Sequence, residues 1–318
     1  MGLVRSALRF LAREHRRKPF GPRVLTLGRQ FIFASPEEAI GFLKAEGVTP
    51  DNVPNDLQEL RSNMPQWKGT PDETNISDIG FFKLLGAQSV QALDYSAFEG
   101  ADYVHDLNTP VPAHLHEQFD LIIDAGTIEH VFNVPQALAN CSMMLKQGGR
   151  IYHSSPSNNA VNHGFYQFSP TLYLDYYTTN AFADLRLFVV DHDAFACRTT
   201  TAQFYEFDGH SRAGMMTSEK QLSVIFVGEK TAQSTIGKTP LQGYYKAQFH
   251  PETNGKIADA PPQMSITDRR SLIGILNRVT PRPIKRLRLQ FLQLLWPATY
   301  KSVDTTKKPW GLKLWDEL

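Results

Sequence analysis

Short apolar runs alternate with capped, helix-length segments along much of the chain. The runs that we predict as strands are 23–28, 89–94, 101–107, 119–126 and 149–156. The segments with helical capping residues or glycine stops are 35–47, 77–86 and 134–149. Strands that alternate with helices at these intervals form right-handed crossover units, in which a mostly parallel sheet is covered on both faces. The pattern therefore predicts an α/β, doubly wound fold.

Two later apolar runs, 185–195 and 221–230, are expected to complete the sheet. The second is predicted as an antiparallel insertion next to the edge, and 204–219 as an excursion between the two. The periodic pattern ends at Lys230, and a basic amphipathic helix at 283–296 indicates a helical C-terminal extension. The predicted units are an N-terminal helix in 1–20, a main domain over 21–230 with an insertion at 31–76, and an extension over 231–318.

Residues 48–76 are rich in Pro, Asn and Asp, and one short helix is expected there, at 55–62. A loop of this length commonly serves as a lid or a binding loop. The insertion that follows the first strand is therefore a candidate to cover a site.

Each of the two basic amphipathic segments could contact one of several partners. In residues 1–18, Leu3, Val4, Ala7, Leu8 and Leu11 share one helical face, and most arginines lie elsewhere. Such a helix can lie on an anionic membrane surface, or dock on its own domain or on a second copy of the chain. We favour docking, and keep peripheral membrane contact and a homo-oligomer as alternatives.

Composition narrows the classes of function. The 318 residues carry a net charge of +1. A chain so close to neutral has no overall electrostatic field that would attract nucleic acid. The two cysteines have no metal-binding spacing, and no apolar run is long enough for a membrane span. Asp191 and His192 would face opposite sides of a strand, so no metal is predicted there. We expect a cytoplasmic protein, with contact at the inner membrane surface left open.

Polar residues follow several predicted strands at the point where each strand ends. They are Gly28-Arg29-Gln30, Asp94-Tyr95-Ser96, Asp106-Leu107-Asn108, Asp124-Ala125-Gly126 and Ser154-Ser155-Pro156. In open α/β sheets, ligands bind outside the carboxyl ends of the strands, near the topological switch point. The sequence therefore predicts a ligand site at this edge.

The segment FDLIIDAGTIEHVFNVPQALANCSMMLKQGGRIYHSSP, residues 119–156, resembles the central part of class I S-adenosylmethionine-dependent methyltransferases. VLTLG at 24–28 resembles a reduced form of that family's first strand and glycine loop, and SVQALDYS at 89–96 resembles its second strand with the terminal acid. The resemblance implies a seven-stranded Rossmann-like sheet with S-adenosylmethionine lying across the strand ends.

The resemblance also implies roles for individual residues in binding the cofactor. Asp94 would accept hydrogen bonds from the ribose, and Asp106 and Leu107 would face the adenine. Gly28 would let the backbone approach the methionine part of the cofactor. Asp124 and Gly126 would line the floor of the pocket beside the sulfonium. The predicted set is completed by Leu27, Arg29, Gln30 and Tyr95.

This chain departs from the family pattern in its first loop, which has one glycine, and in the insertion before the second acid. We expect the insertion to rebuild the pocket, with Arg29 or Gln30 meeting the methionine carboxylate. The alternative is a decayed site.

The run 156–177 is rich in asparagines and aromatic residues, and directly follows a predicted strand. Aromatic rings stack on sugar C–H faces while amides bind hydroxyls, which suits a polyhydroxylated acceptor. HGFYQFSP at 163–170 also resembles methyltransferase-like proteins associated with bacterial glycan and polysaccharide biosynthesis. Alternatively, these aromatic residues belong to the core. The predicted acceptor-binding residues are Glu129, Asn158, Asn159, Tyr166 and Gln167.

Transfer of a methyl group to a hydroxyl requires a base, and the candidates are His130 and His163. Glu129 and His130 could instead serve helix entry, because a carboxylate complements a helix N-terminus. We predict an O-methyltransferase that acts on a sugar, nucleotide-sugar or glycan-related small molecule. The alternative is a non-catalytic protein of the same fold in a biosynthetic complex. A nucleotide-sugar oxidoreductase is disfavoured because no GxGxxG follows the first strand.

Overall fold

The structure is a computed structural model that describes residues 2–62, 74–192, 202–207, 218 and 220–243, and the backbone of 313–317. The predicted helix at 283–296, Cys197 and most of the C-terminal extension lie outside the described residues. The predictions for them therefore stay predictions, as does the division into domains.

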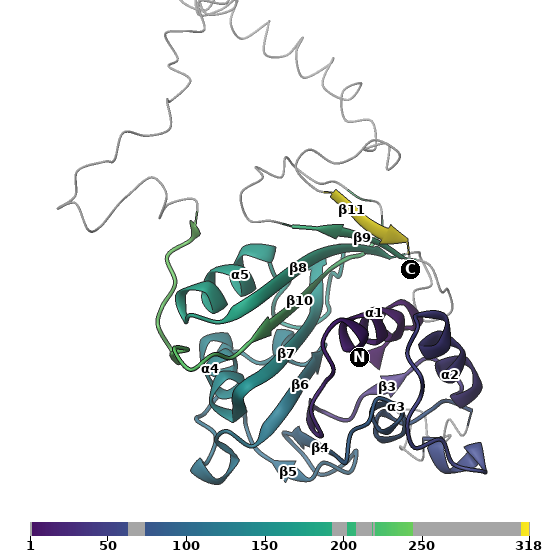
Figure 1. Ribbon diagram of the computed structural model, residues 1–318. Coiled ribbons are helices and arrows are strands. Elements are labelled where there is room, and N and C mark those ends of the chain that lie inside the picture. The colour runs from purple at the N-terminus through teal and green to yellow at the C-terminus, as the bar shows by residue number, and fades with distance from the viewer. Residues whose placement is uncertain are drawn as a thin grey trace, which may run out of the picture.

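A single large twisted sheet organises the described part of the chain (Figure 1). The order of its strands is β11-β9-β8-β10-β7-β6-β2-β4-β5. Pairing is parallel from β7 to β5, and β10 is antiparallel to both β7 and β8. The strands are β2 (Arg23–Leu27), β4 (Ser89–Asp94), β5 (Tyr103–Val104), β6 (Phe119–Ala125), β7 (Leu145–Asn158), β8 (Ala183–His192), β9 (Ala202–Glu206), β10 (Leu222–Glu229) and β11 (Lys313–Glu317). This arrangement confirms the α/β, doubly wound class and the antiparallel insertion.

Two strands of the large sheet were not predicted. Residues 202–206 form β9 beside β8, where the sequence suggested the start of an excursion, and β11 in the C-terminal extension pairs with β9. Both pairings are antiparallel, and they extend the seven-stranded sheet past β8. Added strands satisfy backbone groups that β8 would otherwise leave open at an edge. Residues 313–317, which follow the predicted helix of the extension, therefore form a strand.

Helices cover both faces of the sheet, as Figure 1 shows. The helices are α1 (Arg5–Arg17), α2 (Pro36–Ala45) and α3 (Asp78–Leu84) on one face, and α4 (Val134–Met144) and α5 (Pro170–Thr179) on the other. Three 3-10 turns are η1 (Leu57–Leu60), η2 (Ala113–Leu115) and η3 (Ile128–His130), and a small parallel sheet joins β1 (Gly2–Leu3) to β3 (Phe31–Ile32). Ser35 caps α2 in a capping box with Glu38, as the predicted helix start requires.

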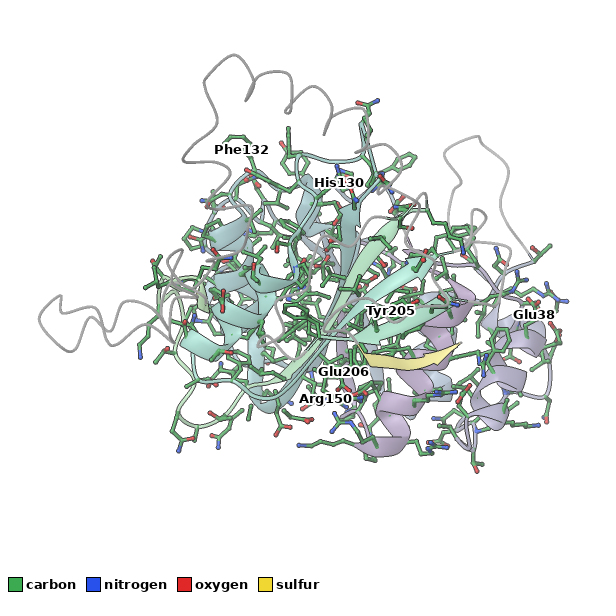
Figure 2. The ribbon with its side chains drawn as sticks, turned by 90° about the horizontal axis from the view of Figure 1, so that it is seen from above. Glu38, His130, Phe132, Arg150, Tyr205 and Glu206 are labelled. Atoms are coloured by element: carbon green, nitrogen blue, oxygen red, sulfur yellow. The ribbon has the colours of Figure 1, made fainter. Side chains whose placement is uncertain are left out.

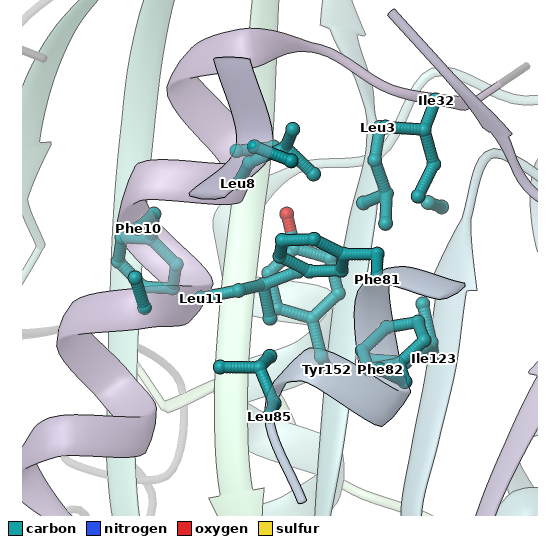
Figure 3. Packing of buried hydrophobic residues seen from close by; sticks show 14 of the residues in the cluster. Leu3, Leu8, Phe10, Leu11, Ile32, Phe81, Phe82, Leu85, Ile123 and Tyr152 are labelled. Atoms are coloured by element: carbon teal, nitrogen blue, oxygen red, sulfur yellow. The ribbon is translucent and has the colours of Figure 1, made fainter. Parts of the chain in front are cut away.

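The N-terminal helix is part of the core. Leu8, Phe10 and Leu11 of α1 pack with Phe81 of α3 and Tyr152 of β7 (Figure 3). The ring of Phe10 also stacks on that of Phe204 of β9, with centroids 5.5 Å apart. The apolar face of α1 is therefore buried within its own chain.

The cations of α1 are bound by acids of the same chain. Buried Glu14 pairs with Arg17, with Arg150 of β7 and with Arg186 of β8. Arg9 and Arg13 both bind the carboxylate of Glu46, which follows α2.

These contacts agree with docking of residues 1–18 on their own domain. Every helix among the described residues is too short or too polar to cross a bilayer. Contact with a membrane surface or a second subunit stays a prediction, as does the compartment.

Candidate functional site

The chain changes direction across the sheet between β2 and β6. From β2 it moves to β4 and β5 on one side, and it then returns to β6 and β7 on the other. This is a topological switch point, where open α/β sheets bind ligands beyond the carboxyl ends of the strands. Figure 2 shows His130 and Phe132 on one side of the molecule, and Arg150, near the start of β7, on the opposite side. The predicted site residues follow β2, β4, β5, β6 and β7 at the first of these sides.

Gly28 forms the turn that leaves β2. Its φ of +68° lies in the left-handed region, and its N–H donates to the carbonyl of Leu93 at 2.7 Å. A Cβ on residue 28 would lie 3.4 Å from Oδ2 of Asp94. The hydroxyl of Thr127, which follows β6, donates to the carbonyl of Leu27 at 2.6 Å. The ends of β2, β4 and β6 therefore meet around this single glycine.

Gln30 and Asp78 hold the loop that follows Gly28. The Gln30 amide donates to the carbonyls of Leu27 and Gly28, at 2.7 and 3.1 Å. The backbone N–H of Gln30 donates to the buried carboxylate of Asp78, the first residue of α3. Burial raises the pKa of Asp78. The loop is thus shaped by the Gln30 and Asp78 side chains.

The Arg29 and Gln30 side chains both have partners within the chain. The Arg29 guanidinium donates to Asp102 at 2.7 Å and to the carbonyl of Gly100 at 3.3 Å, and it lies 3.7 Å from Asp78. The Gln30 side chain is buried and bound to its own loop. Both side chains therefore support the loop, and their contact with a methionine carboxylate stays a prediction.

Asp94 ends β4 as the resemblance implies. Its Oδ1 accepts the N–H of Tyr95, while Oδ2 faces Gly28. The Tyr95 side chain is 75% exposed beside it. The aspartate predicted for the ribose and the glycine predicted for the methionine part are therefore neighbours.

The residues expected near the adenine lie at the adjacent strand end. Asp106 accepts hydrogen bonds from the backbone and side-chain N–H groups of Asn108, and these bonds lower its pKa. Asn108 in turn binds the backbone N–H of Asn133, at the start of α4. Leu107 is buried in the core cluster on the α4 face. Asp106 therefore shapes a turn here, and its adenine role stays a prediction.

Asp124 points into the core. Its Oδ1 accepts the N–H groups of Thr127 and Ile128, and its Oδ2 lies 2.7 Å from Nδ1 of His153 on β7. The other ring nitrogen of His153 lies 2.7 Å from the hydroxyl of Tyr177 on α5. All of these polar groups are buried, which favours the turn-capping role of Asp124 over a place on the pocket floor. Gly126, with φ +94°, makes the turn after β6.

Glu129, His130 and His163 come together beside this turn. Nε2 of His163 lies 3.6 Å from Oε1 of Glu129, and the two imidazole centroids are 5.0 Å apart. Burial and the nearby charge of Asp124 raise the pKa of Glu129 to about 8. Burial lowers the pKa of both histidines, and in His130 the charge of His163 adds to the effect. The two predicted catalytic histidines therefore share one site with the predicted acceptor-binding Glu129.

Gly164 brings His163 to this position. Its φ is +72°, and a Cβ there would lie 2.8 Å from the carbonyl oxygen of Glu129. That carbonyl accepts the backbone N–H groups of Phe165 and Tyr166. The loop after β7 is thereby bound to η3 by its backbone.

The amides predicted to bind an acceptor have structural partners. The Asn159 amide donates to the carbonyls of Ser218 and Lys220, and Gln167 accepts the backbone N–H of Ala160. Exposed Asn158 accepts the N–H of Asn159. We therefore assign Asn159 and Gln167 to loop support, and leave Asn158 as a prediction.

Aromatic side chains around the Glu129 cluster are exposed. Phe132 and Phe165 are 70% and 66% exposed, and their rings meet edge to face at 5.7 Å. The Tyr166 hydroxyl donates to the carbonyl of Phe132. We call Phe132, Phe165 and Tyr166 the aromatic rim. By contrast, Phe168, Tyr173 and Tyr176 are core residues, as the alternative interpretation expected.

Three residues that contact or flank the candidate site were not predicted from the sequence. Thr127 lies between Asp124 and His130, but nothing in its spacing indicates that it binds β2. Asp78 has the pattern of an ordinary first-turn acid, and its contact with Gln30 crosses 48 positions. Phe132 follows the Glu-His pair, and an aromatic residue next to a predicted site could have identified it.

A cavity of about 440 Å³ lies elsewhere, lined by residues that include His15, Phe20, Asp51 and Gly86. Phe20 precedes β2 and Gly86 precedes β4, so this cavity is at the amino ends of the strands. It is separate from the cluster at the switch point.

No family model matches this sequence, and no curated protein matches it. Among solved structures, a methyltransferase dependent on S-adenosylmethionine from Archaeoglobus fulgidus has 12% identity and a TM-score of 0.36, over 71% of this chain and 94% of that one. A 1,6-didemethyltoxoflavin-N1-methyltransferase from Burkholderia thailandensis has 12% identity and a TM-score of 0.33, over 71% and 79%. TehB from Haemophilus influenzae has 11% identity and a TM-score of 0.33, over 69% and 61%. Similarities this weak carry no information about cofactor or substrate.

Proposed function

We propose that this protein is an S-adenosylmethionine-dependent methyltransferase that acts on a hydroxyl of a sugar, nucleotide-sugar or glycan-related molecule. The proposal rests on one observation above all: Gly28 and Asp94 face each other at the switch point of a doubly wound sheet. A carboxylate accepts both hydroxyls of a ribose, and a glycine allows a ligand to approach the backbone. GxGxxG is absent from the sequence, which argues against a dinucleotide.

The contribution of the protein to such a reaction is mainly positional. Methyl transfer is an in-line displacement, and correct alignment of the reactants can supply roughly 7 to 11 kcal/mol of the barrier. The sulfonium is positively charged and is favoured by nearby acids and aromatic faces. The cofactor would lie over Gly28 and Asp94, with its methyl group directed toward the Glu129 cluster.

The aromatic rim supports the choice of acceptor. Exposed rings beside a polar cluster suit a ligand with both apolar C–H faces and hydroxyls. Phe132 and Phe165 offer the rings, and Glu129, His130 and His163 offer the polar groups. This cluster would also take up or acidify the hydroxyl proton that must leave during transfer.

Calorimetric titration with S-adenosylhomocysteine tests the cofactor. We expect binding by the native chain, and a loss of about tenfold or more in Asp94→Ala because the ribose hydroxyls lose their acceptor. Asp184→Ala is the matched control, since Asp184 pairs with Arg17 at the start of β8. Absence of binding by the native chain, or equal affinity in Asp94→Ala, would refute the proposal.

Turnover tests the acceptor class. Incubation with S-adenosylmethionine and a panel of free sugars, nucleotide-sugars and glycan precursors is expected to form S-adenosylhomocysteine and a product heavier by one CH2. Mass spectrometry of both species identifies the methylated class. Activity only on amine or carbon acceptors would contradict the hydroxyl assignment while leaving methyl transfer in place.

A second candidate is a non-catalytic protein of this fold. Its support is that Arg29 already binds Asp102 and that Gln30 already binds its own loop. This candidate predicts no product with any acceptor, even where S-adenosylhomocysteine binds. Product formation that depends on Asp94 would exclude it.

A further inference from the structure

We infer that Glu129, His130 and His163 form a binding site for a divalent transition-metal ion. Each residue offers one candidate ligand atom, and these atoms all lie within 4.8 Å of one another. Two imidazoles and one carboxylate form a ligand set typical of catalytic Zn²⁺ and non-haem Fe²⁺ sites. Metal binding here does not depend on the proposed function, whereas the role of the ion in methyl transfer does.

Glu129 supplies an independent reason to expect a cation. Its side chain is fully buried, and neither Oε1 nor Oε2 has a hydrogen-bond partner among the described residues. A buried carboxyl without partners destabilises the folded state, because it loses its hydrogen bonds to water and gains none in return. Nε2 of His163 is likewise buried and has no partner in the described part of the chain. A cation bound between Glu129 and His163 would give these facing atoms the partner that they lack.

The spacing of the atoms fits coordination better than a direct hydrogen bond. The 3.6 Å between His163 Nε2 and Glu129 Oε1 is too long for a hydrogen bond. Two ligands that each lie about 2.1 Å from a tetrahedral ion are separated by about 3.4 Å. The pair is therefore close to coordination distance, and His130 completes the set by a rotation of its exposed ring.

The backbone preorganises this arrangement. The Glu129 carbonyl holds Phe165 and Tyr166, and Gly164 allows the two segments to touch. His163 is thereby fixed against η3 by contacts that need no metal. The three ligands come from two loops, after β6 and after β7, which rigid neighbouring strands place together.

The ligand types indicate which ions bind. Mg²⁺ prefers oxygen ligands in octahedral geometry, whereas imidazole favours Zn²⁺, Fe²⁺ and related ions. We therefore expect Zn²⁺ or Mn²⁺ to bind more tightly than Mg²⁺. Three protein ligands also leave a coordination position for an oxygen atom of another molecule.

In the proposed function, that position would take the acceptor hydroxyl, since the aromatic rim belongs to the same two loops as the ligands. Coordination lowers the pKa of a bound oxygen acid, so the proton leaves to solvent. The oxygen then forms a bond to the methyl carbon while the carbon–sulfur bond breaks. The electron pair of that bond stays on sulfur, and the sulfonium becomes a neutral thioether.

Titration of the full chain, first treated with a chelator, with ZnCl2, MnCl2 and MgCl2 tests the site. We expect one Zn²⁺ or Mn²⁺ per chain by calorimetry and elemental analysis, and at least tenfold weaker binding of Mg²⁺. Glu129→Gln and His163→Ala should each weaken Zn²⁺ binding roughly 100-fold. His114→Ala, which removes an exposed histidine on η2, is the control and should bind as the native chain does.

Glu129 is buried, so its variant could fail to fold, which circular dichroism of the metal-free protein would reveal. His130 is exposed, and His130→Ala provides a second test with the fold intact. Zn²⁺ affinity that is unchanged in His130→Ala and His163→Ala, or no stoichiometric binding by the native chain, would overturn the inference. Titration of metal-free protein with S-adenosylhomocysteine keeps the two proposals separate, because Asp94 and Gly28 do not belong to the metal site.

Discussion

Asp124 and His153 face each other on the neighbouring strands β6 and β7, with Oδ2 and Nδ1 2.7 Å apart and both side chains fully buried. The pair continues to the Tyr177 hydroxyl, so it links two strands of the sheet to α5. It lies in the core behind the turn that carries Thr127, and it positions that turn from within.

His153→Phe is expected to destabilise the protein by about 3 kcal/mol, since it leaves an Asp124 oxygen and the Tyr177 hydroxyl without partners in the core. Urea unfolding followed by circular dichroism measures the change. His114→Ala should stay within about 0.5 kcal/mol of the native chain, as expected for an exposed site. Equal stability of the two variants would show that the buried pair contributes nothing.

Glu14→Gln should lower the free energy of unfolding by about 3 kcal/mol, because it leaves the buried guanidinium of Arg150 without its carboxylate. Lys146→Ala removes a partly exposed ion pair with Asp120 and should cost about 0.5 kcal/mol. Chemical denaturation of both variants measures the difference. A Glu14→Gln variant as stable as Lys146→Ala would mean that the Glu14 carboxylate contributes little to the docking of α1.

Titration of Glu46 should make the stability of the protein depend on pH. Burial opposes ionisation of this carboxyl, but hydrogen bonds from Arg13 and Arg9 outweigh it and lower the pKa. Because the folded pKa lies below the unfolded value, the contribution to stability is present above about pH 4.5 and is lost as pH falls through the folded pKa. The difference in unfolding free energy between the native chain and Glu46→Gln should therefore shrink from pH 7 to pH 3. A constant difference would contradict this assignment.

Gly28→Ala should weaken binding of S-adenosylhomocysteine by about tenfold or more, since a Cβ would fill space beside Asp94 that the ligand needs to approach the backbone. The substitution also places alanine at φ +68°, which costs about 1 kcal/mol of stability. Gly148→Ala is matched in strain, with φ +78° and no atom within 4 Å of the added Cβ. Calorimetry should show unchanged affinity in Gly148→Ala. Equal affinity in both variants would place the ligand elsewhere.

The parts of the fold that could be predicted are those with strong local patterns. The capping pair of Ser35 and Glu38 predicts the start of α2, and the apolar run 119–125 predicts a buried strand. The strand at 202–206 is short and lies between segments without clear periodicity, so only its pairing with β8 reveals it. Local patterns also cannot determine which atom a polar side chain contacts. Arg29, Gln30, Asn159 and Gln167 have the residue types of a ligand site, yet their partners belong to the fold.

In the candidate site, too, local patterns predicted some residues and tertiary contacts determine the others. Asp94 and Gly28 could be predicted because each follows a strand directly, and parallel strands end at one edge. The approach of His163 to Glu129 depends on Gly164 and on the loop after β7, whose shape is determined by tertiary contacts. The sequence spacing of these ligands therefore gave no indication of a metal.

The position of β10 determines how far synthesis must proceed before the sheet can close. β8 and β9 leave the ribosome before β10, but β8 is joined to β7 only through β10. A chain that stops at residue 206 would contain every residue of the proposed site and still have no strand to carry β8 and β9. Shortened versions of this protein must therefore extend past Glu229.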